Sequence, residues 1–238
     1  SSTPIEQAIE STGMCDIVET NEDLLITDHT PGAALPTRTW TLRLYTGDQV
    51  GQAYVGPFVL DRRHPMTTGL SLDGVVWGAR DNLALPGQAL ITAGNVPLLT
   101  QIGRDEDTVH LHMQWQRDLS TLVQSPDWPA LWWNLLSWRS SEMPGPSRSL
   151  LHVGELASVL RSTTTAAPML VIKPDGSQHA IPQTDRRARW TIDSPGVYLM
   201  NSPGDSSGAG TLVICANVGD AAESDLTQKA SGSDRKST

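Results

Sequence analysis

Apolar and polar residues alternate in short runs along most of the chain, and this period of two predicts many β-strands. The runs in the N-terminal part are Leu24–Thr27, Thr39–Tyr45, Gln52–Leu60, Leu70–Ala79, Ala89–Ala93, Pro97–Ile102 and Val109–Trp115. In the last run, Val109, Leu111 and Met113 alternate with His110 and His112, so the two sets face opposite sides of one strand.

The stretch after this strand changes to a helical period. Apolar residues fall at i, i+3, i+4, i+7 and i+8, which is a core-facing helical stripe: Trp128, Leu131, Trp132, Leu135 and Leu136. Ser125 is the expected N-cap with Pro126 in the first turn, and Asp127 is the alternative cap. Trp133 and Trp138 widen the stripe, so we expect this helix to be covered on more than one side.

A shorter helix is predicted near the N-terminus. Thr3, Pro4 and Glu6 form a capping-box pattern ahead of Ile5, Ala8 and Ile9.

The Ser/Pro/Gly-rich segment Ser140–Ser149 is the strongest break in composition, and it predicts a boundary between residues 145 and 146. Short extended runs with little helix follow, which predicts a β-sandwich over residues 146–226. The segment Asp193-Ser-Pro-Gly-Val-Tyr198 resembles the tyrosine corner of immunoglobulin-like domains, with Met200 in place of the usual cysteine. Residues 227–238 are polar and are expected to form a disordered tail.

Charge and cysteine content narrow the classes of function. A net charge of -9 argues against binding to nucleic acid or to an anionic membrane surface.

Cys15 and Cys215 lie too far apart in sequence to indicate a disulfide framework, and the apolar run around Cys215 predicts a buried thiol. No apolar run is long enough to span a bilayer. The first residue is Ser, so we expect an excised or processed soluble piece of a larger protein.

The strand and loop before the long helix carry the candidate chemistry. His110 and His112 share one strand face and can ligate a divalent metal such as zinc, with Asp118 or His64 as a third ligand. Asp118-Leu-Ser120 also matches the start of the D-x-S-x-S motif of metal-ion-dependent adhesion sites, whose oxygens bind Mg²⁺, although Leu122 replaces the last serine. The alternative is that Asp118 and Ser120 form a turn and the histidines a polar strand face. We find no complete catalytic motif and expect no organic cofactor.

Three groups of segments together resemble one family. They are Gly56-Pro-Phe58 with His64-Pro65, Gly69-Leu70 and Gly74–Trp77; Leu85-Pro-Gly87 with Ala93–Leu98; and Asp118–Ser120, Pro126–Trp128, Asn134–Leu136, Ala216-Asn217 and Glu223–Leu226. Over residues 24–226 this order is similar to the large soluble region of bacterial BatA-like proteins, which are aerotolerance-type, membrane-anchored and related to von Willebrand A domains.

The resemblance implies an α+β chain. It would have an N-terminal mixed α/β domain, either part of a von Willebrand A domain or a glutamine-amidotransferase-like relative without its nucleophile, followed by an immunoglobulin-like sandwich. It further implies a membrane anchor in flanking sequence, a place on the periplasmic side of a bacterial inner membrane, and protein partners that include other membrane-anchored von Willebrand A-type proteins.

These features agree with three functions. The first is a non-catalytic extracytoplasmic interaction or scaffolding domain. The alternative is a metal-assisted hydrolase that uses His110, His112 and Asp118. A third is a carbohydrate- or peptide-binding surface built on exposed tryptophans such as Trp190.

Overall fold

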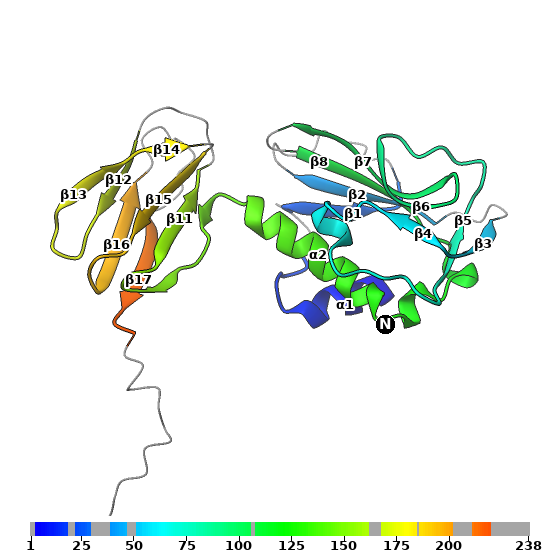
Figure 1. Cartoon of the computed structure of the whole chain (residues 1–238), viewed down its shortest axis with the longest axis horizontal. Helices are drawn as coiled ribbons and strands as arrows, with labels where there is room; N and C mark the ends of the chain where they lie inside the picture. Colours follow the sequence, from blue (N-terminus) through cyan, green and yellow to red (C-terminus); the bar gives the residue numbers. More distant parts are fainter. Residues whose placement is uncertain are drawn as a thin grey trace, which may run out of the picture. The chain divides into compact units, whose positions relative to one another are not determined.

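The chain forms two compact units, Ser1–Ser141 and Glu142–Thr238. The structure, a computed structural model, describes residues 3–18, 22–29, 39–46, 51–105, 108–161, 168–184, 186–201 and 211–219. The fold is mixed α/β, with few helices and many strands in several sheets (Figure 1). The units divide between Ser141 and Glu142, whereas the sequence predicted a boundary after residue 145. The predicted tail at 227–238 lies outside the described residues.

The first unit is built on a six-stranded mixed sheet. Its strands, in spatial order, are β1 (Leu24–Thr27), β2 (Trp40–Tyr45), β8 (Thr108–Gln114), β7 (Val96–Asp105), β6 (Gln88–Ala93) and β4 (Phe58–Leu60). The pairs β1–β2 and β2–β8 are parallel, and the remaining pairs are antiparallel. A separate antiparallel pair joins β3 (Gln52–Val55) to β5 (Val76–Ala79).

The helices α1 (Pro4–Thr12) and α2 (Asp127–Glu142) lie on the same side of this sheet (Figure 1). The predicted capping box of α1 is confirmed, because Thr3 Oγ1 accepts from Glu6 N at 3.2 Å while the Glu6 carboxylate accepts from Thr3 N at 2.6 Å. At the start of α2, Ser125 Oγ accepts from Asp127 N at 3.1 Å. Three short 3-10 helices, η1 (Pro65–Thr67), η2 (Arg117–Leu119) and η3 (Leu122–Gln124), lie in the connections.

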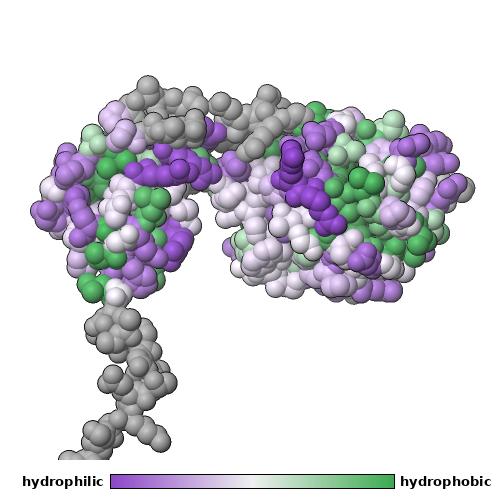
Figure 2. Space-filling view, in the orientation of Figure 1, coloured by the Kyte–Doolittle hydropathy of each residue, from purple (hydrophilic) through white to green (hydrophobic). Residues whose placement is uncertain are grey.

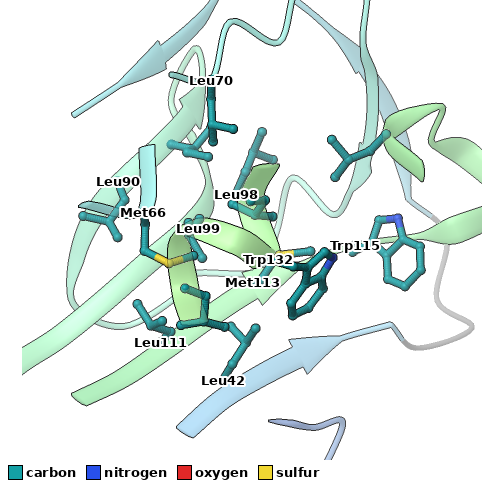
Figure 3. Packing of buried hydrophobic residues seen from close by; sticks show 14 of the residues in the cluster. Leu42, Met66, Leu70, Leu90, Leu98, Leu99, Leu111, Met113, Trp115 and Trp132 are labelled. Carbon is teal, nitrogen blue, oxygen red and sulfur yellow. The ribbon is translucent and has the colours of Figure 1, made fainter. Parts of the chain in front are cut away.

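The core of the first unit fills the space between the sheet and the helices. Leu42, Leu111 and Met113 gather with Met66 and Trp132 in this space (Figure 3). Indole rings contact one another along it, with centroid distances of 5.0 Å for Trp115–Trp128, 5.2 Å for Trp128–Trp132 and 4.5 Å for Trp40–Trp138. The predicted stripe of α2 is confirmed as core.

The expectation that Trp133 widens the buried stripe is wrong, because half of its surface (50%) is exposed. At about 100° per residue, Trp133 lies about 60° beyond Leu136, which is the edge of the buried stripe. Trp138 lies at the other edge and is buried against Trp40. The helix therefore leaves one face to solvent.

The second unit contains two sheets that share a core. The five-stranded sheet has the order β10 (Leu150–His152), β17 (Leu212–Asn217), β16 (Gly196–Asn201), β12 (Met169–Ile172) and β13 (Gln178–Ile181). The four-stranded sheet has the order β14 (Gln183–Thr184), β15 (Arg187–Thr191), β11 (Leu156–Leu160) and β9 (Gly145–Pro146). Val159 and Trp190 from the second sheet pack in one cluster with Val171 and Ile214 from the first, so the sheets face each other as a sandwich.

The Tyr198 hydroxyl makes the hydrogen bonds that the sequence pattern predicts. It accepts from Ser194 N at 3.0 Å and donates to the Asp193 carboxylate at 2.9 Å. The phenol thus ties the start of β16 to the backbone just upstream.

Two expectations about this unit are wrong. Cys215 is exposed, because its neighbours Ile214 and Ala216 face the core and alternation turns residue 215 outward. Trp190 is buried between the sheets, with 9% of its surface exposed. It cannot anchor a carbohydrate or peptide on the surface.

Candidate functional site

A polar cluster lies on the face of the six-stranded sheet opposite α2. The parallel register of β2 and β8 pairs Thr41 with His110 and Arg43 with His112. Alternation points these side chains and that of Tyr45 away from the core-facing residues Leu42, Leu44, Leu111 and Met113. We call Thr41, Arg43, Tyr45, His110 and His112 the Arg43 cluster; Thr41 is buried and the other four are half-buried.

Hydroxyl groups of β2 hold both imidazole rings of β8. Thr41 Oγ1 lies 2.8 Å from His110 Nδ1, and Tyr45 Oη lies 3.0 Å from His112 Nδ1. The Arg43 guanidinium carbon stacks 4.8 Å from the centre of the Tyr45 ring. The cluster is therefore fixed in orientation by contacts between two neighbouring strands.

The electrostatics of the cluster are cationic. Burial lowers the pKa of His112, and the charges of Arg43 and His110 lower it further, so the ring is neutral near pH 7. Within the described part of the chain, the buried Nε of Arg43 and Nε2 of His112 have no hydrogen-bond partner. Buried polar atoms without partners are uncommon in folded proteins and call for a physical explanation.

The structure does not gather the predicted metal ligands into one site. Across the described ranges, no group of three or more His, Cys, Asp or Glu side chains is placed to hold a metal ion. Asp118 is exposed on η2. Ser120 Oγ donates to Val76 O at 3.1 Å and accepts from Leu122 N at 3.3 Å, which is the turn that the sequence offered as the alternative.

His64, the other predicted third ligand, lies on the opposite face of the sheet. Its Nδ1 accepts from Met66 N at the start of η1, and its Nε2 lies 2.7 Å from Gln101 Oε1. Gln101 pairs with the core-facing residue Leu111. Of the four predicted site residues, only His110 and His112 come together.

Sequence reasoning missed the residues of β2. The alternation of Thr39–Tyr45 puts Thr41, Arg43 and Tyr45 on one face, but nothing in the sequence says which strand lies beside them. The parallel pairing with β8 supplies that information.

A second candidate surface lies on the sandwich unit, where the outer face of the five-stranded sheet is apolar. Register pairs Leu150 with Cys215 and Cys215 with Val197 in one row, and Val213 with Leu199 and Leu199 with Ile172 in the next. Leu150 is 61% exposed, Val197 48% and Val213 41%.

The described strand side chains on this face include no Asp, Glu, Lys or Arg; the polar ones are His152, Gln178 and Asn217. The outer face of the four-stranded sheet, by contrast, carries Arg187 and Arg189. Figure 2 shows hydrophobic patches on the surface of both units.

No protein-family model, curated protein or solved structure matches this chain. None of the helices in the described ranges is both long enough and apolar enough to cross a membrane.

Proposed function

We propose that this chain is a non-catalytic interaction domain of a membrane-anchored, BatA-like bacterial protein, and that it acts on the extracytoplasmic side of the membrane. The observation that carries the interaction role is the apolar outer face of the five-stranded sheet, whose described strand side chains include no charged one. Contiguous exposed apolar surface on a sheet typically marks a protein interface. The resemblance of residues 24–226 supports the location and the anchor.

The strand order supports an immunoglobulin-like assignment for the second unit. The order β9, β11, β15, β14 follows the A-B-E-D sheet of that fold, and β17, β16, β12 follow the G-F-C sheet, with β13 added beyond C. Tyr198 lies near the start of β16, the equivalent of strand F, where the tyrosine corner belongs. In the first unit, the parallel strands β1, β2 and β8 with helices on one side agree with a partial von Willebrand A-type half.

The partner that best fits the outer face is a second copy of the chain, packed face to face. Two copies of a flat apolar face are complementary about a two-fold axis, and two sheets pack about 10 Å apart in this way. The lack of charged side chains means that no like charges meet there, although each chain carries a net charge of -9.

The size of the face sets the strength of the association. The five strands have 3, 6, 6, 4 and 4 residues. At about 3.3 Å per residue and about 4.8 Å between strands they cover roughly 360 Å², a little less than half of the about 800 Å² that each partner buries in a standard interface. We therefore expect a weak dimer that forms at hundreds of micromolar. Added salt should strengthen it by screening the repulsion between two acidic chains.

Sedimentation velocity over a concentration series tests this proposal. We expect Val197→Lys and Val213→Lys to remain monomeric where the wild type dimerises. Leu156→Lys is the matched control, because Leu156 is also an exposed apolar strand residue (59%) but lies on the other sheet. A wild type that stays monomeric to about 1 mM, or an equal loss with Leu156→Lys, would show that a second copy is the wrong partner.

Thiol cross-linking gives an independent readout of the same face. In a Cys15→Ser variant, Cys215 is the remaining thiol of this chain and lies on the proposed interface, on the strand next to the edge strand β10. A short bis-maleimide should link two chains through Cys215 and should fail with Val213→Lys. The parent protein in intact cells should react with a membrane-impermeant maleimide if the domain is extracytoplasmic.

A further inference from the structure

We propose that the Arg43 cluster is a binding site for a carboxylate, on the face of the sheet opposite α2. This site is separate from the sandwich face and does not depend on the proposed dimer. Its ligand is a monoanion that accepts hydrogen bonds from Arg43 Nε and from the Nε2 edge of His112.

The Thr41 and Tyr45 hydroxyls contact Nδ1 of the two imidazoles, so the Nε2–H groups of the rings can act as hydrogen-bond donors. Thr41 and Tyr45 hydroxyls can each donate to the Nδ1 that they contact, at 2.8 and 3.0 Å. A neutral imidazole that accepts at Nδ1 carries its proton on Nε2. In this tautomer His112 has a buried Nε2–H without a partner, and its register partner Arg43 has a buried Nε–H without a partner.

The charge of the cluster selects an anion over a cation. Among the described residues Arg43 forms no ion pair. Its register partners are His112 on β8 and Thr27 on β1, and Thr41 and Tyr45 flank it on its own strand. From β7, Thr100 and Ile102 lie on the same face. A guanidinium next to the imidazoles opposes a bound metal ion, whereas a carboxylate would neutralise it and satisfy both orphaned donors.

The same count of charges favours a carboxylate over a phosphate. Arg43 supplies one permanent positive charge, and His112 is neutral because burial opposes its protonation. One guanidinium balances a monoanion, and a planar carboxylate has two oxygens for adjacent N–H donors. A phosphate dianion would leave one buried negative charge without a counterion.

Nuclear magnetic resonance of the whole ¹⁵N-labelled chain at constant ionic strength and pH tests the site, with acetate as the probe against chloride. We expect saturable shifts of the Arg43 Nε–H and His112 ring signals with a millimolar Kd. Arg43→Gln should weaken binding at least tenfold. Arg63→Gln is the matched control, since Arg63 is exposed on a loop of the same unit, and it should bind as the wild type does.

His112→Gln provides a second variant if Arg43→Gln fails to fold, and it should also weaken acetate binding. Free organic acids and the acidic side chains of a partner share this chemistry. Tighter binding of N-acetylglutamate amide than of acetate would assign the site to a protein carboxylate, and equal binding would assign it to small acids.

Three results would overturn the proposal. One is the absence of a saturable shift up to about 200 mM acetate, which would leave ordered water as the partner of both donors. Another is an unchanged acetate affinity in both Arg43→Gln and His112→Gln. Phosphate binding that is tighter than acetate binding would refute the proposal that the ligand is a monoanion.

Discussion

Asp127 joins the start of α2 to a loop far away in sequence. Its carboxylate is buried, accepts from the backbone N–H groups of Ser71 and Leu72 at 3.0 Å each, and accepts from Ser125 Oγ at 3.2 Å. Leu72 has a φ of 59°, a left-handed conformation that costs a non-glycine residue about 1–2 kcal/mol. The carboxylate therefore holds an unfavourable backbone in place.

We expect Asp127→Ala to lower the free energy of unfolding of the first unit by about 3 kcal/mol, because two backbone donors lose their acceptor. Urea denaturation measures the loss. Asp118→Ala is the control and should stay within about 0.5 kcal/mol of the wild type, as exposed positions do. A loss below about 1 kcal/mol for Asp127→Ala would show that water replaces the carboxylate.

Protonation of Asp193 lowers the stability of the sandwich unit as the pH becomes acidic. Hydrogen bonds from Lys173 and Tyr198, in that order, lower the pKa of Asp193 from 3.8 to about 2. A carboxyl whose pKa is depressed by folding stabilises the folded state fully above its unfolded pKa. That contribution is lost as the pH falls from about 4 through about 2.

We expect Asp193→Asn to be less stable than the wild type at pH 7 and to approach it at pH 2. Urea unfolding followed by the fluorescence of Trp190 across this range gives the difference between the two proteins. Other carboxyl groups titrate in both proteins and cancel in that difference. A gap that stays constant with pH would contradict the assigned role of Asp193.

At the scale of elements, the two ends of β6 place different demands on glycine. Gly87 and Gly94 both have positive φ, at 94° and 57°. A Cβ on Gly87 would lie 2.2 Å from the carbonyl oxygen of Gln101 on β7, whereas a Cβ on Gly94 would meet nothing within 4 Å. Gly87 is thus required by space as well as by conformation.

This contrast predicts unequal costs for the same substitution. We expect Gly94→Ala to lower the free energy of unfolding by about 1 kcal/mol, the cost of left-handed backbone, and Gly87→Ala by more than about 3 kcal/mol. Urea midpoints of the two variants settle the comparison. Similar midpoints would mean that the β6–β7 pair can shift to admit a methyl group.

The elements that the sequence predicted best are those with strong local signals. The stripe of α2, the capping box at Thr3 and the alternation before Trp115 depend on residues close in sequence, and the structure contains all three. Strand pairing depends on long-range packing, so the parallel contact between β2 and β8 was not predictable. The Arg43 cluster therefore could not be assembled, and the predicted set of His110, His112, Asp118 and Ser120 followed sequence proximity instead.

The misplaced side chains have one common physical cause. Trp133 and Cys215 are apolar, so their residue type predicted burial. The direction in which a side chain points from its helix or strand determines whether it is buried. Trp133 lies off the covered arc of its helix, and Cys215 is out of phase with Ile214 and Ala216. A hydrophobic residue adjacent to a buried one is exposed when the element's period turns it outward.

At the scale of the whole molecule, the two units have separate hydrophobic cores with no residue in common. We expect urea unfolding in two steps. Trp190 is the only tryptophan in residues 142–238, so it reports the second unit, and Trp190→Phe should remove that signal. Gly87→Ala should move the midpoint of the first unit and leave that of the second within about 0.3 M urea. One shared transition that shifts as a whole would show that the units fold together.

The row of touching indoles in the first unit has an optical consequence. With ring centres 5.0 and 5.2 Å apart, the excited states of Trp115, Trp128 and Trp132 couple, and ultraviolet light is absorbed by the group instead of by single rings. Such coupling produces paired bands of opposite sign in circular dichroism, which vanish when the rings separate. The packing that holds α2 against the sheet thus gives the protein its own chiroptical label, and no dye is needed to follow the formation of this core.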